Sequence, residues 1–294
     1  MRFALLNSGL GLLAAASELH RMRPDADLII AMDPDGMPWG PRTPQDIAER
    51  SLALARAAAA YGPDVIVFAC NTGTVHALGA LRAEFEPQIP VVGTVPAIKP
   101  AAAASDSVAI WATVATTASD YQRRLIEDFG GQATVTPVAC PGLATAIDAG
   151  EQAAVASAIA EAAVRTPSGS GAVVLGCTEY ELATEQIGAA VPGAALFGSA
   201  AAVAAQALRR IGLSAAADAD VGGAGIGGAD GVSLAHVNGV ALGTLRVLLS
   251  GRPSTLPEVA LHYRQGRELA ALAVGPRRSN PGITSQRPPA PATS

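Results

Sequence analysis

The sequence predicts an α/β protein of two similar, pseudo-symmetric lobes, each a mainly parallel sheet flanked by helices, with the active site in the cleft between them. The main observation is a stretch, residues 64–72, which is repeated at 171–179; in each, an apolar run is followed by a cysteine, Cys70 and Cys177. Such unbroken runs are typical of parallel strands that are covered on both faces. The flanking strands repeat at a similar separation: residues 2–8 with 108–113, and 90–94 with 194–199.

The first lobe is expected to begin with a strand over residues 3–6 and a helix over about 10–21. Asn7 and Ser8 lie at the end of this strand. Their polar side chains could hold a substrate or could cap the helix, and Gly9 lets the backbone turn tightly between the two elements. The residues themselves leave both uses open.

A second strand over residues 26–31 leads into a loop with the sequence Pro38-Trp39-Gly40-Pro41-Arg42. Two prolines and a glycine around a large aromatic residue predict a stiff surface loop that presents backbone N–H groups. Loops of this kind often close over small anions. The next helix is expected to run from Pro44 to about Tyr61, because Thr43 is a favourable N-cap and proline is favourable in the first turn.

The first cysteine strand places Cys70 at its carboxyl end, followed by Asn71 and Thr72. Ligands bind at this end of the strands in open α/β sheets. The helix expected over residues 74–85 begins beside the thiol, and its positive end favours both a bound carboxylate and a thiolate. A strand over residues 90–93 completes the lobe.

The second lobe is expected to open with a strand over residues 107–112, followed by Thr113 and Thr116. Their hydroxyl groups could bind a carboxylate or could cap the next helix. Cys140 stands before a proline and outside the repeat, so we expect a packed thiol. The other elements expected in this lobe are strands over 133–138 and 194–198 and helices over 119–129, 150–164 and 200–211.

The C-terminal part is expected to form helices over about 233–250 and 257–273 that pack on the first lobe. The glycine-rich stretch at residues 221–231 lacks the lysine of a phosphate-binding loop, so we interpret it as a mobile connection. From residue 275 on, the absence of apolar periodicity predicts a disordered tail.

Composition favours a small-molecule partner. The net charge of −5 and the pI of about 5.4 predict no basic surface for nucleic acid. No stretch is long and apolar enough for a convincing membrane span. Three cysteines argue against a disulfide framework and for a reducing compartment, so we expect a cytoplasmic protein. The first twenty residues faintly resemble a signal peptide, but a strand, a glycine turn and a helix explain the same letters.

Two cysteines that face each other across a cleft could form a disulfide, bind a metal or act as acid and base. The reducing compartment disfavours the disulfide. Zinc needs further ligands, and the four histidines show no ligand spacing with either cysteine, so no metal is expected. Acid and base catalysis fits best, because inversion of a carbon beside a carboxylate requires one base and one acid on opposite faces. No cofactor is then needed, and Lys99 is the only lysine that pyridoxal phosphate could use.

The two cysteine motifs, Cys70-Asn71-Thr72 and Gly176-Cys177-Thr178, together with the loop at Trp39, resemble the cofactor-independent aspartate/glutamate racemase superfamily, and glutamate racemases most closely. The resemblance covers nearly all of residues 1–212. It implies an acidic amino acid as substrate, a two-base mechanism through the cysteines, and a homodimer. It also implies a first lobe of residues 1–99 with 209–274 and a second of 100–208. The substrate contacts that it implies are Ser8, Pro38, Trp39, Gly40, Asn71, Thr72, Thr113, Thr116 and Thr178.

Two positions depart from glutamate racemases, which have an aspartate where this chain has Asn7 and a histidine where it has Glu179. The resemblance assigns both positions to the catalytic machinery. Aspartate racemases of the superfamily have a glutamate after Gly-Cys-Thr, and Glu179 could restore a negative charge in the site. Asp148 aligns with a carboxylate near the family's site. Two alternatives stay open: an isomerase or decarboxylase of a dicarboxylic acid, suggested by Asn7, and a catalytically idle ligand-binding protein.

Overall fold

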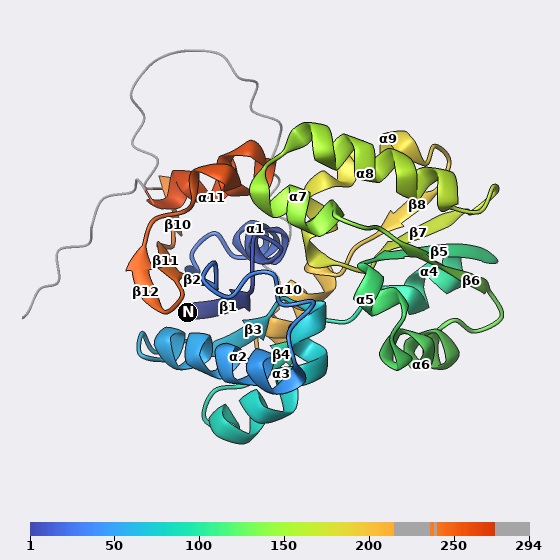
Figure 1. Cartoon of the computed structure of the whole chain (residues 1–294). Helices are drawn as coiled ribbons and strands as arrows, with labels where there is room; N and C mark the ends of the chain where they lie inside the picture. The colour runs from blue at the N-terminus through green and yellow to red at the C-terminus, as the bar shows by residue number, and fades with distance from the viewer. Residues whose placement is uncertain (215–235, 238–239, 274–294) are drawn as a thin grey trace, which may run out of the picture.

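A computed structural model describes residues 1–214, 236–237 and 240–273 of the chain (Figure 1). Two parallel sheets, each flanked by helices, form the two lobes. The first sheet has six strands in the order β12-β11-β2-β1-β3-β4, and the second has four in the order β6-β5-β7-β8. The glycine-rich stretch at 221–231 and the tail from 275 on, which the sequence analysis interpreted, lie outside the described residues.

The core of the first sheet consists of four parallel strands: β1 (Arg2–Asn7), β2 (Asp27–Met32), β3 (Val65–Phe68) and β4 (Val91–Gly93). Alternate residues of these apolar runs face opposite sides of the sheet. Phe3 and Leu5 pack towards α1 (Leu12–Met22), whereas Ala4 and Leu6 pack towards α2 (Pro44–Ala59) and α3 (Asn71–Phe85). Both faces are therefore buried, as the unbroken apolar runs predict.

The second sheet repeats this arrangement with β5 (Ser107–Ala112), β6 (Thr134–Ala139), β7 (Ala172–Leu175) and β8 (Ala195–Phe197). The strand order β6-β5-β7-β8 matches β2-β1-β3-β4 of the first sheet, and all neighbouring strands are parallel. One face packs against α4 (Ile98–Ala104) and α6 (Asp120–Phe129). The repeat that the sequence indicates is therefore a repeat of topology, and it places the two cysteine strands β3 and β7 at equivalent positions.

The C-terminal part differs from the sequence prediction. The helix expected over residues 233–250 is wrong, because β11 (Leu245–Leu249) extends the first sheet as a parallel neighbour of β2. A short apolar run fits a helix or a strand equally well, and here the free edge of β2 selects the strand. A short pair, β9 (His236–Val237) with β10 (Val240–Ala241), precedes β11, and β12 (Arg252–Ser254) pairs antiparallel with it. The helix expected over 257–273 is divided into η2 (Glu258–His262) and α11 (Arg264–Ala273).

Several short helices escaped the sequence analysis: α4, α5 (Val114–Thr117) and α7 (Leu143–Ala149). The second cysteine strand is followed by the 3-10 helix η1 (Thr178–Ala183) and then by α9 (Thr184–Ala190), while α8 (Gln152–Arg165) precedes it. Helix α10 (Ala200–Arg210) packs against α1, β3 and β4 of the first lobe. The expected lobe boundaries at 99/100 and 208/209 stay a prediction. Among the described residues, no helix combines the length and apolar character that a membrane crossing needs.

Candidate active site

A cavity of about 430 Å³ lies where the carboxyl ends of β3 and β7 face each other. Residues from both lobes line it, and two parallel sheets present the ends at which ligands usually bind. From the first lobe the lining comprises Ser8, Pro38, Trp39, Gly40, Pro41, Cys70, Asn71 and Thr72. From the second lobe it comprises Thr113, Val114, Ala115, Thr116, Cys140, Pro141, Gly142, Ala144, Thr145, Asp148, Gly176, Cys177 and Glu179.

Cys70 lies directly after β3 and caps the N-terminus of α3. Its Sγ accepts a hydrogen bond from the Gly73 N–H at 3.4 Å. Gly73 is required here because a Cβ would lie 2.3 Å from the ring of Phe68. Burial, together with the negative charge of Glu179, raises the pKa of the Cys70 thiol to about 12. Burial and this charge therefore both favour the protonated thiol of Cys70.

Cys177 occupies the equivalent position after β7, at the start of η1. Its thiol donates a hydrogen bond to Oε2 of Glu179 at 2.8 Å. Burial raises the pKa of Cys177 well above the ordinary value, and the charge of Glu179, its hydrogen bond and the charge of Cys70 act in the same direction. The two thiols are therefore close enough to affect each other's ionisation.

Asn7 does not line the cavity but lies fully buried beneath it. Its Nδ2 donates to the Ala69 carbonyl at 2.8 Å, to Oγ1 of Thr178 at 3.2 Å and to Oε1 of Glu179 at 3.4 Å. Thr178 also lies beneath the surface and its hydroxyl approaches Oε2 of Glu179 at 3.4 Å. Asn7 thus joins the end of β1 to the second cysteine motif, and a neutral amide holds the Glu179 carboxylate in place.

Asn71 links the two cysteine motifs, since its Nδ2 donates to the Gly176 carbonyl at 2.7 Å. Its Oδ1 is buried and has no hydrogen-bond partner among the described residues, which is costly unless a ligand or water satisfies it. Thr72 follows in the first turn of α3 and faces the same cavity. This helix end therefore offers backbone and side-chain polar groups to a bound molecule.

The hydroxyl-rich segment after β5 also borders the cavity. Thr113 caps α5, accepting from the Thr116 N–H at 3.3 Å, and its hydroxyl lies 3.0 Å from that of Thr116. On the opposite wall, Ser8 binds Oδ1 of Asn7 through its N–H at 2.6 Å and its hydroxyl at 3.2 Å. Thr113 therefore both caps a helix and lines the cavity, whereas Ser8 lines the cavity but does not cap α1, whose N-cap Gly11 has no side-chain hydrogen bond.

Sequence reasoning gave Asp148 in α7 no role of its own and assigned the glycines after β1 only to a tight turn. Oδ1 of Asp148 accepts from the Leu10 N–H at 2.8 Å, across the two lobes. Burial raises the pKa of Asp148 to about 8, and the charge of Glu179 contributes. A Cβ at Gly9 would lie 2.4 Å from Asp148, and one at Gly11 would lie 2.3 Å from Oγ1 of Thr178. The two glycines at positions 9 and 11 are visible in the sequence, but only the structure shows that they leave room for Asp148 and Thr178.

Charge is distributed unevenly around the cavity. Two carboxyl groups, Asp148 and Glu179, face it, whereas none of the described lining residues is lysine, arginine or histidine. No cluster of three or more metal-ligating side chains occurs in the part of the chain that the structure describes. The cavity therefore suits a small molecule that brings its own positive group, with anionic groups bound by neutral donors.

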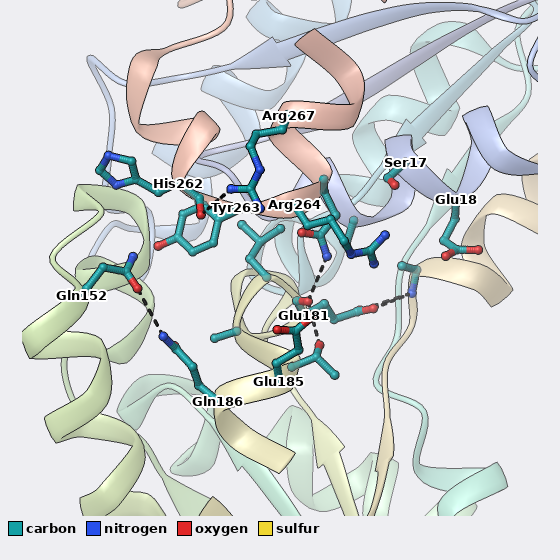
Figure 2. Close-up of a pocket in the computed structure, with 16 residues that line it drawn as sticks. Ser17, Glu18, Gln152, Glu181, Glu185, Gln186, His262, Tyr263, Arg264 and Arg267 are labelled. Carbon is teal, nitrogen blue, oxygen red and sulfur yellow. Dashed lines mark hydrogen bonds between the residues drawn. The ribbon is translucent and has the colours of Figure 1, made fainter. Parts of the chain in front are cut away.

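A second cavity, of about 400 Å³, lies on the other side of η1, between α1, α9 and α11 (Figure 2). Its buried carboxylate belongs to Glu181, whose Oε1 accepts from the N–H of Ser199 at 2.8 Å and from its hydroxyl at 2.9 Å. These contacts satisfy the N-terminus of α10, so Glu181 has a structural use. None of the site residues expected from the sequence lines this cavity.

The fold and the site define a two-lobed α/β enzyme whose repeated halves each supply one cysteine to a shared cavity. The family model for Asp/Glu/Hydantoin racemase matches residues 6–207. A glutamate racemase from Herpetosiphon aurantiacus is 38% identical over 73% of this chain and 85% of its own length, and one from Ectopseudomonas mendocina is 34% identical over 71% and 81%. The chain therefore belongs to the Asp/Glu/Hydantoin racemase family.

Solved structures agree with this assignment. Escherichia coli glutamate racemase, in complex with L-glutamate and the activator UDP-MurNAc-ala, is 29% identical and superposes with a TM-score of 0.68 over 73% of this chain and 84% of its own. Glutamate racemase from Thermus thermophilus, with a TM-score of 0.63 over 95% and 96%, is 24% identical and shows the common fold.

Proposed function

We propose that this protein is a cofactor-independent glutamate racemase that inverts the α-carbon with Cys70 and Cys177 as its two acid–base groups. The single observation that carries the proposal is that equivalent positions of the two lobes place one thiol each on the same cavity. The relatives named glutamate racemase support glutamate as the substrate. One thiolate removes the α-proton, and the other thiol delivers a proton to the opposite face, so the reverse reaction exchanges their roles.

The substrate ammonium group is proposed to bind beside Glu179 and Asp148, the two carboxyl groups of the cavity. Both thiols have raised pKa values, and no cationic side chain occurs among the described residues that line the cavity. A bound ammonium group adds positive charge and so lowers the pKa of a neighbouring thiol. Formation of the catalytic thiolate is thereby linked to the arrival of an amino acid.

Glu179 is proposed to accept the proton of Cys177, since the thiol already donates to Oε2 at 2.8 Å. Asn7 keeps this carboxylate in position through its Nδ2 without adding charge. The α-carboxylate and the side-chain carboxylate are proposed to bind to neutral donors at the start of α3, at Ser8, at Thr113 and Thr116, and along residues 38–40. Charge that builds on the α-carboxylate as the carbon becomes planar is stabilised by such fixed donors.

The first experiment is racemisation of each enantiomer of glutamate in deuterated water by Cys70→Ser and Cys177→Ser. Each variant is expected to lose at least about 100-fold in kcat, because each removes one of the two proton-transfer groups. Cys140→Ala is the matched control, since this third thiol also lines the cavity but has no assigned role. Wild-type turnover in either serine variant would refute the two-base assignment.

Two further measurements separate this function from the two alternatives. A dicarboxylic acid isomerase or decarboxylase would convert malonate or maleate derivatives and leave glutamate unchanged. A binding protein would bind glutamate in calorimetry without exchange of the α-proton. We also propose a cytoplasmic homodimer, for which sedimentation equilibrium and cell fractionation are the tests.

A further inference from the structure

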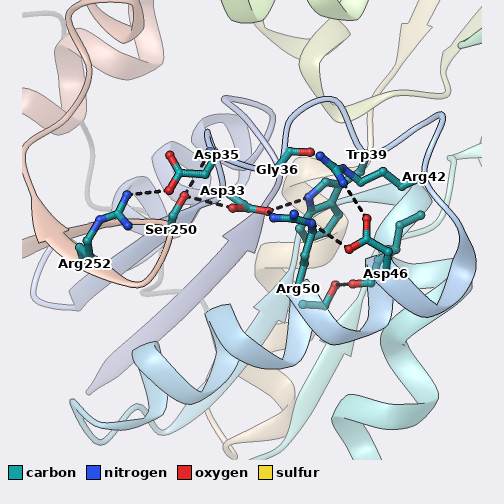
Figure 3. Close-up of polar contacts among 11 residues, drawn as sticks. Asp33, Asp35, Gly36, Trp39, Arg42, Asp46, Arg50, Ser250 and Arg252 are labelled. Carbon is teal, nitrogen blue, oxygen red and sulfur yellow. Dashed lines mark hydrogen bonds and ion pairs between the residues drawn. The ribbon is translucent and has the colours of Figure 1, made fainter.

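The start of the loop that borders the cavity is attached to the rest of the first lobe through the carboxylate of Asp33 (Figure 3). Asp33 follows β2 and is 4% exposed. Its Oδ2 accepts from the indole Nε1 of Trp39 at 3.0 Å and from Arg50 at 3.2 Å, and its Oδ1 accepts from the Ser250 hydroxyl at 3.1 Å. Three segments of the chain, namely the loop, α2 and the turn after β11, therefore meet at a single buried group.

The backbone of Asp33 adds two further attachments. Its N–H donates to the Ser8 carbonyl at 3.1 Å, so it contacts the segment after β1 that also lines the cavity. Its carbonyl accepts from Gly36 at 3.0 Å and Met37 at 3.1 Å, which closes the turn that leads into residues 38–40. Asp33 thus fixes the start of the loop as well as its aromatic side chain.

Trp39 transmits this attachment towards the first catalytic cysteine. Its side chain is 2% exposed, and its ring lies 6.1 Å from that of Phe68, centroid to centroid. Phe68 is the last residue of β3, and its ring fills the space at Gly73, whose N–H donates to Cys70. The indole is therefore part of the packing that sets the wall of the cavity, and its N–H is used by Asp33.

The far end of the loop is fixed separately on α2. Arg42 donates through Nε to the Gly36 carbonyl and through its guanidinium to Asp46 at 2.7 Å, and Arg50 binds the other oxygen of Asp46 at 3.1 Å. Within the loop, a Cβ at Gly40 would have no atom of the described residues within 4 Å. The segment between the two attachments is thus held at both ends and faces open space, as a preformed ligand contact requires.

We propose that Asp33 is a positioning residue: by holding Trp39, Arg50 and Ser250 together, it fixes residues 38–40 in the geometry that binds the substrate. The inference rests on the proposed function for its substrate, but the geometry stands on contacts that are present without one. Because Asp33 does not line the cavity, it acts through the loop and not on the reacting atoms.

The test uses Asp33→Ala in a Trp111→Phe background, in which Trp39 is the only tryptophan of the chain. The KM for glutamate is expected to rise about tenfold, the effect of losing roughly one charge-assisted hydrogen bond, whereas kcat stays within about threefold. Acrylamide quenching of Trp39 without substrate is expected to increase. Asp35→Asn is the matched control, because Asp35 lies two residues on in the same turn and pairs at the surface with Arg252 at 2.7 Å.

Adding Trp39→Phe to Asp33→Ala is expected to cause no further rise in KM, because the two residues act through one contact. Asp33→Asn, which keeps the shape and one acceptor oxygen, is expected to give a smaller rise and so covers the case in which the alanine variant does not fold. Unchanged KM or unchanged quenching in folded Asp33 variants would overturn the proposal, as would an equal effect of Asp35→Asn. If the wild-type protein does not racemise glutamate, but Asp33→Ala still increases the quenching of Trp39, the result counts against the proposed function and not against the positioning role of Asp33.

Discussion

At the scale of single residues, Glu179 affects the ionisation of both cysteines of the site. The carboxylate raises the pKa of both thiols by its charge, in addition to the effect of burial, and it binds the Cys177 proton directly. The carboxylate that disfavours the Cys177 thiolate is thus also well placed to receive the Cys177 proton. We therefore expect both thiols to react slowly with alkylating agents when no substrate is added.

Glu179→Gln separates these two effects. Removing the negative charge lowers the pKa of Cys177 and Cys70, so alkylation by iodoacetamide at pH 8 is expected to become faster. Racemisation is expected to fall by about 100-fold, because the proton acceptor of Cys177 is lost. Peptide mass spectrometry measures alkylation at each cysteine, and Glu185→Gln on the surface of α9 serves as the control. Slower alkylation together with slower turnover would contradict the electrostatic role.

Gly11 shows how closely the first lobe approaches the second cysteine motif. Gly11→Ala would place a Cβ 2.3 Å from Oγ1 of Thr178 and 2.7 Å from Oε1 of Glu179, so it is expected to lower the free energy of unfolding by about 1–3 kcal/mol and to reduce activity. Gly79→Ala is the matched comparison, because Gly79 lies exposed within α3 with no atom within 4 Å of its Cβ position. That variant is expected to gain about 0.5–1 kcal/mol. Urea denaturation measures both, and equal stabilities would contradict the packing argument.

At the scale of elements, the sequence predicted the long and strongly patterned segments well. The strand expected over 107–112 has those same limits as β5, and Thr43 caps α2 before Pro44, as predicted. Buried strands and capped helices are specified by their own residues. The short helices α4 and α7 were missed, because seven residues contain too few turns for a periodic pattern to be recognised.

The segment Leu245–Leu249 was assigned to a helix for a different reason. Its residues are compatible with either state, and the deciding factor is the unpaired edge of β2, more than 200 positions earlier in the chain. The candidate site follows the same rule. Cys70 and Thr113, which local sequence motifs identify, do line one cavity. The roles of Asp33, Asp148 and Gly11 depend on contacts with other segments of the chain, which local sequence does not reveal.

At the scale of the whole molecule, Asp148 connects the lobes through the Leu10 N–H, and its ionisation links stability to pH. Burial raises its pKa from 3.8 to about 8, and the charge of Glu179 adds to the rise. In that range the folded state binds a proton that the unfolded state has already released. The contribution of this group to stability is therefore fully present below about pH 4 and is lost as the pH rises to about 8.

Asp148→Asn removes this dependence, because the amide remains neutral and still offers an oxygen to Leu10. The variant is expected to match the wild type near pH 4 and to become increasingly more stable than the wild type between pH 4 and 8, with no further change above that. Urea unfolding of both proteins at several pH values measures the difference. Glu181, whose pKa burial also raises, is common to both proteins and cancels. A difference that does not vary with pH would contradict the linkage.

The turn after β11 has a consequence for how the protein matures during synthesis. Ser250 donates to Asp33, 217 positions earlier in the chain, and so completes the support of the loop beside the cavity. A nascent chain that has left the ribosome only as far as residue 240 contains both cysteines and strands β1 to β8. It lacks β11 and β12, and with them the turn that supports this loop. Ribosome-bound intermediates are therefore expected to fold their lobes before they acquire full affinity for an amino acid.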